Sequence, residues 1–131
     1  MNKPVGRWLV DGHLSGEILK LDAPLSFWGG FDATTGTIID RAHPQCSALL
    51  AGKVVAMPGS KGSSGTPGVL GESLRRGTGP LAMIVTKADI NLVAGALTAA
   101  ALYATTCPIL LVDAPTFASL ESGSMIDATS T

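Results

Sequence analysis

Three short apolar runs constrain the fold of this chain more than any other feature. They cover residues 53–57, 81–85 and 108–112. Continuous apolar runs of this length are typical of strands buried on both faces of a sheet. A helix is predicted between each pair, one over 69–76 and one of about fifteen residues that starts near Ile90, with Asp89 as its N-cap. This order of elements predicts right-handed crossover units in the second half of the chain.

The first half of the chain predicts further strands. Residues 8–14 and 16–21 alternate or run apolar over the length of a strand, and the step between them predicts a hairpin or a corner. A connector over 23–32 contains three aromatic residues and two glycines, and 35–40 reads as a turn into another short strand. The predicted fold class is therefore mixed α/β, with a β core and crossover helices.

The length of the chain and its C-terminal part set the expected domain limits. A chain of 131 residues is large enough for one domain with a real core, and no repeat or linker divides it. Beyond Phe117 the sequence is polar, and only Met125-Ile126 suggests a last edge strand. We therefore expect a single domain over 1–131 with an ordered core of about 8–117 and a polar tail.

The uncharged stretch 90–112 raises the question of a membrane segment. Its 23 residues are enough to cross a bilayer. However, it contains Asn91 and several threonines and is broken by Pro108, so a buried helix followed by a buried strand explains it better. The alanines and glycine of that helix predict a close approach to another backbone, which we expect to be the sheet. No membrane partner is expected.

Charge and cysteine content exclude other classes. The net charge is −1 without a basic run, which argues against a nucleic-acid partner. Only 15% of the residues are charged, which indicates that a partner chain or a second domain covers part of the surface. Cys46 and Cys107 are too few for a disulfide framework or a metal cage, and we expect both to be reduced core residues. Without the apolar region of a signal peptide at the N-terminus, a cytoplasmic location is expected.

A glycine-rich loop joins the first apolar run to the first predicted helix. The sequence AMPGSKGSSGTPGVLGE over 56–72 has no bulky apolar side chain between its flanking elements. Thr66-Pro67 reads as a helix N-cap followed by proline at the first helical position. Such a turn leaves backbone N–H groups free to meet an anion, with Ser63 and Ser64 where those donors converge. The alternative is an ordinary solvent-exposed loop.

Several segments together resemble a known family. These are PLSFWGGFD at 24–32, TGTIIDRAHP at 35–44, AGKVVAMPGSKGSSG at 51–65 and the later GALTAAALY. In this order they are similar to the small, swivelling domain of aconitase X, and the resemblance covers residues 8 to 112. That domain occurs either fused to a large catalytic domain or as a separate small subunit, and this chain looks like the separate form.

The resemblance implies a hydro-lyase subunit that is active only with a large subunit. It implies a swivelling β/β/α fold that closes over the site and an iron or iron–sulfur centre on the partner large subunit, with no metal ligand from this chain. By position, the catalytic serine is Ser63, with substrate-binding candidates at Ser64, Lys61, Gly62 and Gly65. In aconitases outside this branch an arginine that binds the substrate carboxylate follows the two serines. Gly65 takes its place, which leaves the role of Ser64 open.

Two substrates fit the resemblance, and we favour cis-3-hydroxy-L-proline over phosphomevalonate. A serine hydroxyl acts as a base only as an alkoxide stabilised by backbone donors, a helix N-terminus and a nearby cation. The loop supplies the first two of these, and Lys61 is the candidate cation. Phosphomevalonate calls for more cations, and the chain offers only Arg41 besides.

Other residues have weaker claims to the site. Asp40 and His43 flank a strand end and are possible cleft residues, although a surface aspartate and a capping histidine are the simpler readings. His13 is expected to be structural. The aromatic residues Phe27, Trp28 and Phe31 are expected to pack on the partner, or alternatively to close the core beneath the loop.

Two functions of another class would need residues that the loop lacks. A phosphohistidine-type swivelling domain would need a reactive histidine on the loop, and residues 59–68 contain none. A nucleotide-binding module would need the P-loop order, in which lysine directly follows the final glycine, whereas Lys61 precedes it. A non-catalytic swivelling module that binds anions or carries phosphoryl groups therefore stays the alternative to an enzyme.

Overall fold

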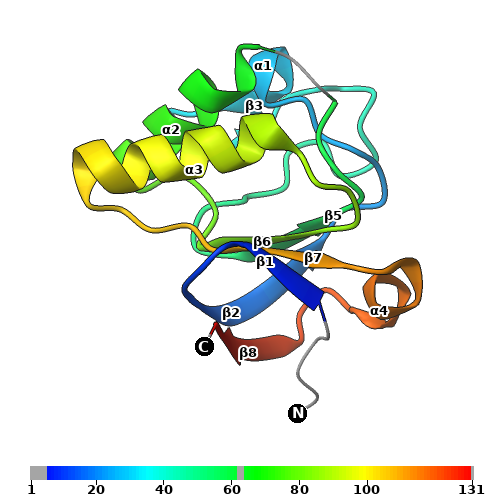
Figure 1. Ribbon diagram of the computed structural model, residues 1–131. Helices are drawn as coiled ribbons and strands as arrows, with labels where there is room; N and C mark the ends of the chain where they lie inside the picture. Colours follow the sequence, from blue (N-terminus) through cyan, green and yellow to red (C-terminus); the bar gives the residue numbers. More distant parts are fainter. Residues whose placement is uncertain (1–5, 62–63, 131) are drawn as a thin grey trace.

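A twisted six-stranded sheet organises the chain. The computed structural model describes residues 6–61 and 64–130. The sheet has the order β1-β7-β6-β5-β2-β8, and a separate two-stranded sheet pairs β3 with β4 (Figure 1). The strands are β1 (Gly6–Val10), β2 (His13–Lys20), β3 (Phe31–Asp32), β4 (Thr37–Ile38), β5 (Val54–Met57), β6 (Ala82–Val85), β7 (Ile109–Val112) and β8 (Met125–Thr129). The helices are α1 (Phe27–Gly30), α2 (Thr66–Arg76), α3 (Ile90–Tyr103) and α4 (Ala114–Ser119).

The four middle strands of the sheet are parallel. Strand β5 pairs in parallel with β2 and β6, and β6 pairs in parallel with β7. All residues of β5 and β6 are buried, as continuous apolar runs predict. Helices α2 and α3 form the crossovers between β5, β6 and β7. The predicted mixed α/β class and the crossover helices are confirmed.

The two N-terminal strands meet at a corner. Strand β1 pairs antiparallel with β7 at one edge of the sheet, whereas β2 pairs with β5 and with β8 at the other side. The hairpin that we kept as an alternative for this segment is therefore wrong. Because β2 and β5 are parallel, a long connection must carry the chain between them, and it contains α1, β3 and β4.

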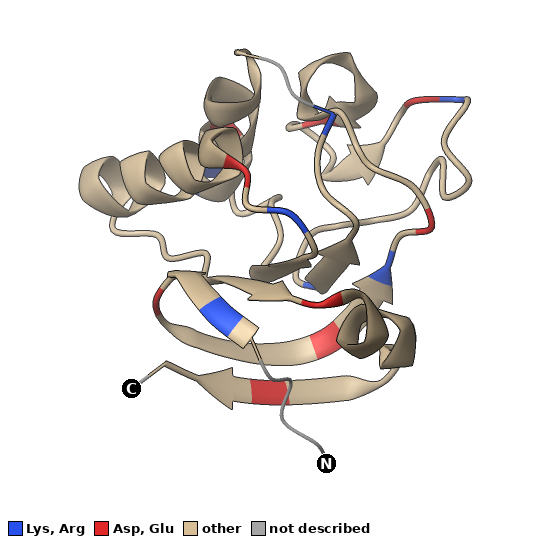
Figure 2. Cartoon of the chain, turned by 45° about the vertical axis from the view of Figure 1, so that its right-hand side comes forward, with Lys and Arg blue, Asp and Glu red and all other residues tan. Residues whose placement is uncertain are grey.

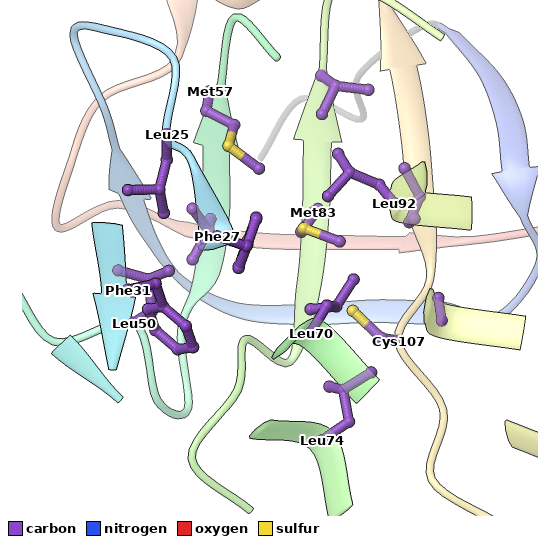
Figure 3. Close-up of a cluster of buried hydrophobic side chains, with 14 of the residues drawn as sticks. Leu25, Phe27, Phe31, Leu50, Met57, Leu70, Leu74, Met83, Leu92 and Cys107 are labelled. Carbon is purple, nitrogen blue, oxygen red and sulfur yellow. The ribbon is translucent and has the colours of Figure 1, made fainter. Parts of the chain in front are cut away.

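Helices α2 and α3 cover one face of the sheet together and enclose the larger core (Figure 1). Methionine and leucine side chains from the sheet and both helices fill this core (Figure 3). The close approach of α3 is to α2 and not, as we expected, to the sheet. A Cβ atom on Gly95 would lie 3.2 Å from the Cα atom of Pro67 and equally close to its carbonyl oxygen. Gly95 thus serves helix–helix packing.

A second core lies on the opposite face of the sheet. It contains Leu14, Ile18, Val54, Ala56, Ala82, Ile84, Leu110, Val112 and Ile126. Phe117 and Leu120, from the segment of α4, pack against it. The ordered structure therefore extends to β8, past the expected core limit at residue 117. The edge strand predicted from Met125-Ile126 is confirmed, since β8 pairs antiparallel with β2 at the edge.

The three aromatic residues of the connector divide between the interior and the surface. Phe27 and Phe31 are buried and pack edge to face, with ring centroids 5.3 Å apart. Trp28 lies between them in sequence, and its side chain is 62% exposed. Core closure is therefore the role of the two phenylalanines and not of the tryptophan.

The sequence predicts one of two helix starts correctly. The Asp89 side chain accepts a hydrogen bond of 2.9 Å from the Asn91 N–H, which confirms it as the N-cap of α3. Helix α2 begins at Thr66, three residues before the predicted range of 69–76. Its N-cap is Gly65, without a side-chain capping bond, so the prediction of Thr66 as the N-cap is wrong. Among the residues that the structure describes, no helix is long and apolar enough to cross a membrane.

Candidate functional site

The glycine-rich loop lies at the edge of the sheet where the parallel strands end. It follows the carboxyl end of β5, next to the segment 86–89 that follows β6, and both segments lead into helix N-termini (Figure 1). The Thr86 hydroxyl donates a hydrogen bond of 2.8 Å to the Pro58 carbonyl and joins the two segments. Open α/β sheets commonly bind ligands at this side, where the carboxyl ends of the parallel strands lie.

The start of the loop is fixed to helix α3 through one carboxylate. The Ser60 hydroxyl donates to Oδ2 of Asp89, while Oδ1 of the same carboxylate caps the helix at the Asn91 N–H. Both groups are partly buried. Sequence reasoning identified Asp89 as a cap but gave no signal for the second bond, because the partner comes from a different crossover unit.

The backbone on the other side of the loop start pairs with the connector. The Leu25 N–H donates to the Gly59 carbonyl at 3.4 Å, and the Lys61 N–H donates to the Leu25 carbonyl at 3.1 Å. Leu25 and Ser60 thus form an isolated parallel bridge. The backbone of Lys61 is held in place, while its side chain is exposed at the surface.

The end of the loop is covered by the exposed tryptophan. A Cβ atom on Gly65 would lie 1.7 Å from Cδ1 of Trp28, so the indole occupies the space that any side chain at this position would need. The Ser26 hydroxyl donates a hydrogen bond of 2.8 Å to the Trp28 carbonyl. The next residue, Gly29, has a φ of +82°, a conformation that favours glycine. These features hold the backbone at Trp28, whose indole lies against Gly65.

Thr66, the first residue of α2, has a buried hydroxyl. Its Oγ1 has no hydrogen-bond partner among the residues that the structure describes. A buried hydroxyl without a partner costs free energy, which a ligand or a neighbouring loop group would recover. The next residue, Pro67, has no N–H, so the Thr66 hydroxyl is a side-chain donor at a helix start that has one backbone donor fewer. This arrangement suits an anionic or hydroxyl-bearing group.

Three of the five predicted loop residues lie in the part of the chain that the structure describes. Ser63 and Gly62 lie outside the described residues. Ser64 is exposed in the turn directly before Gly65. The structure therefore brings Lys61, Ser64 and Gly65 into one loop whose two ends are anchored.

The two possible cleft residues have structural bonds. His43 is buried, accepts a bond of 3.0 Å at Nδ1 from the Gln45 N–H and donates from Nε2 to the Ala23 carbonyl at 3.0 Å. Asp40 is half-buried and accepts a bond of 2.9 Å from the Ala42 N–H. These bonds fit the simpler reading of a capping histidine. Asp40, for which the simpler reading was a surface residue, is half-buried and closes a turn.

The cysteines have the character of ordinary core residues and not of metal ligands. Cys107 is buried, and burial raises the pKa of its thiol to about 12, so the thiol stays protonated at neutral pH. Cys46 is half-buried, and both thiols are free. Within residues 6–61 and 64–130, no three His, Cys, Asp or Glu side chains come together in a group that could hold a metal. An iron centre thus finds no ligand set in the described part of this chain.

The comparison with protein families identifies the fold. The family profile described as "Aconitase X swivel domain" matches residues 3–131, nearly the whole chain. The chain belongs to the aconitase X family. Its fold is similar to a solved structure of Thermococcus kodakaraensis aconitase X in its holo form, with a TM-score of 0.86 and 28% identity over 98% of this chain and 92% of that one. The resemblance seen in the sequence is confirmed.

Relatives within the aconitase X family differ in length. A cis-3-hydroxy-L-proline dehydratase of Pseudomonas aeruginosa is 40% identical over 105 residues, which are 80% of this chain but only 18% of that protein. A phosphomevalonate dehydratase small subunit of Thermococcus onnurineus is 34% identical over 121 residues, which are 92% of this chain and 87% of that subunit. The chain therefore spans about a fifth of the hydroxyproline dehydratase and most of the small subunit.

Proposed function

We propose that this chain is the small subunit of an aconitase X-type hydro-lyase and supplies the serine base for the dehydration of a small hydroxy acid. The observation that carries the proposal is a glycine–serine loop anchored at both ends beside the N-terminus of α2. Ser60 bonds to Asp89 at one end, and Gly65 lies under Trp28 at the other. Anchored ends reduce the entropy cost of holding a reactive hydroxyl in place.

Ser63 is proposed to take the proton from the carbon next to the substrate carboxylate. The C–H electron pair forms the new double bond as the C–O bond on the adjacent carbon breaks. The leaving oxygen keeps the electron pair of that bond and takes one proton from solvent, so it departs as water, while Ser63 holds the proton that it removed. A serine oxygen is basic enough for this step only where its negative charge is stabilised. The α2 N-terminus and loop amides, including those of Gly62 and Gly65, are proposed to supply that stabilisation, with the Lys61 ammonium as the nearby cation.

Substrate recognition is assigned to the same loop. Ser64 is exposed beside Gly65, and the buried Thr66 hydroxyl lies at the first position of α2. Both are suited to bind a substrate carboxylate or hydroxyl, which compensates for the arginine that Gly65 replaces. Asp40 and His43 stay minor candidates for the cleft wall.

We assign the iron or iron–sulfur centre to a large subunit. The described residues offer no ligand set for it, and the P. aeruginosa relative has more than four-fifths of its length outside the part that matches this chain. The complex is proposed to be a heterodimer or a higher assembly. Its cytoplasmic location stays a prediction.

Cis-3-hydroxy-L-proline is the proposed substrate, and phosphomevalonate is the alternative. The 40% identity to the P. aeruginosa hydroxyproline dehydratase gives the first only slight support, because the identity is 38% to the phosphomevalonate dehydratase small subunits of Methanopyrus kandleri and Pyrococcus furiosus. Similar chain length to the T. onnurineus small subunit favours the second. The exposed Lys61 and Arg41 are the cations that would be available to a phosphate group.

A phosphocarrier function has less support. The buried His43 uses both ring nitrogens in hydrogen bonds to the backbone. His13 is the first residue of β2, so it lies at the amino end of a parallel strand, away from the edge that carries the loop. Neither histidine is positioned to accept a phosphoryl group at this loop.

The test is the activity of the co-expressed complex. The chain and its large subunit are purified together and assayed for water loss from cis-3-hydroxy-L-proline and from phosphomevalonate, with wild-type protein and with Ser63→Ala. The proposal predicts turnover of one substrate and its loss in the variant, with the complex intact on gel filtration. Turnover of neither substrate by an intact complex would contradict it.

A further inference from the structure

Two large apolar side chains are exposed on either side of the glycine loop. Trp28 is 62% exposed and lies against Gly65 at the end of the loop. Ile90 is 82% exposed and directly follows Asp89, whose carboxylate holds Ser60 at the start of the loop. The loop is thus bordered by apolar surface at both of its anchor points.

The apolar surface continues from Ile90 along the outer face of α3. Ile90, Ala94, Leu97 and Ala101 follow the i, i+4, i+7, i+11 spacing of one helical stripe. Ile90 and Leu97 are among the exposed large hydrophobic residues. The helix has no Lys, Arg, Asp or Glu, as Figure 2 shows by its uniform tan colour. A surface helix of a free-standing domain normally has a polar outer face, so this one is suited to contact another protein surface.

The proposed function and the relatives identify what covers this surface. In the P. aeruginosa relative the matching part is 18% of the polypeptide, so a much larger part of the same chain accompanies this domain. A loop that acts on a substrate held by another subunit must face that subunit, and the side chains that border the loop face it too. Only 15% of all residues are charged, which also fits a domain that is partly covered.

Resting on the proposed function, we propose that Trp28 and Ile90, with Leu97 behind Ile90, are the apolar contacts by which this chain docks on the large subunit around the reactive loop. The contact joins the subunits and also excludes water from the loop, because Trp28 and Ile90 lie at the two ends of the loop. Large exposed aromatic and aliphatic residues at the centre of a contact are the usual sources of binding energy.

The test is the affinity of single variants for the large subunit. Trp28→Asp and Ile90→Asp are compared with Met125→Asp, a matched control because Met125 is 59% exposed but lies on the edge strand β8. Aspartate at the first position of α3 is compatible with the helix dipole, so Ile90→Asp should fold. Circular dichroism verifies the fold of each variant. Surface plasmon resonance with immobilised large subunit then gives the dissociation constants.

We expect Trp28→Asp and Ile90→Asp each to weaken binding by about tenfold or more, with Met125→Asp close to wild type. Unchanged affinity of both folded variants would overturn the docking surface, and so would failure of the wild-type chain to bind. A third outcome would also overturn it: the wild-type chain dimerises by itself through Ile90, and Ile90→Asp has the same affinity for the large subunit as the wild type. The assay needs no turnover, so it is independent of the role of Ser63.

Discussion

The Ser60 hydroxyl donates a hydrogen bond to the Asp89 carboxylate, and the other oxygen of that carboxylate caps helix α3. One side chain therefore fixes both the start of the glycine loop and the start of the next crossover helix. Loss of the hydroxyl and loss of the carboxylate should have different consequences, which makes the pair testable.

Ser60→Ala should lower turnover more than it lowers stability. It frees the loop start but leaves the α3 cap in place, whereas Asp89→Ala also removes the cap and should cost about 1 kcal/mol more in the free energy of unfolding. Urea unfolding of the chain and turnover of the complex measure the two effects. Equal loss of stability in the two variants, with turnover unchanged in Ser60→Ala, would count against the anchor.

Gly65→Ala should destabilise the chain, because the new methyl group overlaps the Trp28 indole. Overpacking costs about 1–3 kcal/mol in a packed core, and the cost here should be near the lower end, because the indole is 62% exposed and can turn aside. In a chain that already has Trp28→Ala, adding Gly65→Ala should cost much less stability than it costs in the wild-type chain, because the indole is no longer there to overlap. Thermal unfolding of the four chains forms a double-mutant cycle, and additive effects would show that the two residues do not interact.

Thr66→Val should leave stability unchanged or raise it, while it lowers kcat/KM. The side chains have similar shape, and the hydroxyl that is removed is buried without a partner among the described residues. If this hydroxyl binds the substrate, the loss of a hydrogen bond in the complex should reduce kcat/KM by about tenfold. Thr66→Ser keeps the hydroxyl and is the control. A stable Thr66→Val complex with full activity would remove Thr66 from the site.

Acid should weaken helix α2 through one exposed carboxylate. Hydrogen bonds from Arg75, and then from Arg76, lower the pKa of Glu72 from 4.5 to about 2. Because the pKa is lower in the folded state, the stabilisation is present above pH 4.5 and is lost as the pH falls toward 2. Urea unfolding should show the wild type losing its advantage over Glu72→Gln across this range. A difference that is constant with pH would contradict the assignment.

The sequence predicts the centre of this fold well because strands buried on both faces leave a continuous apolar signal. This signal predicts strands β5, β6 and β7. A separate signal, the capping residue Asp89, predicts the start of α3. The edge strand β8 has a weaker signal. Only its alternate residues Ile126 and Ala128 are buried, and polar residues separate them.

Contacts between distant segments are what local patterns cannot supply. The bond of Ser60 to Asp89 joins two crossover units, and the hydroxyl that meets the carboxylate depends on how β5 and β6 are placed side by side. In the same way, the FWGGF pattern does not reveal that the two phenylalanines turn inward while Trp28 faces out over Gly65.

The claim that Ser63 is the base is tested most directly by proton exchange. The complex is incubated with substrate in D2O, and NMR follows the exchange of the proton next to the carboxylate for deuterium. Wild-type complex should exchange this proton, and an intact Ser63→Ala complex should not, while Ser64→Ala should retain exchange. Exchange at the wild-type rate in Ser63→Ala would contradict the account.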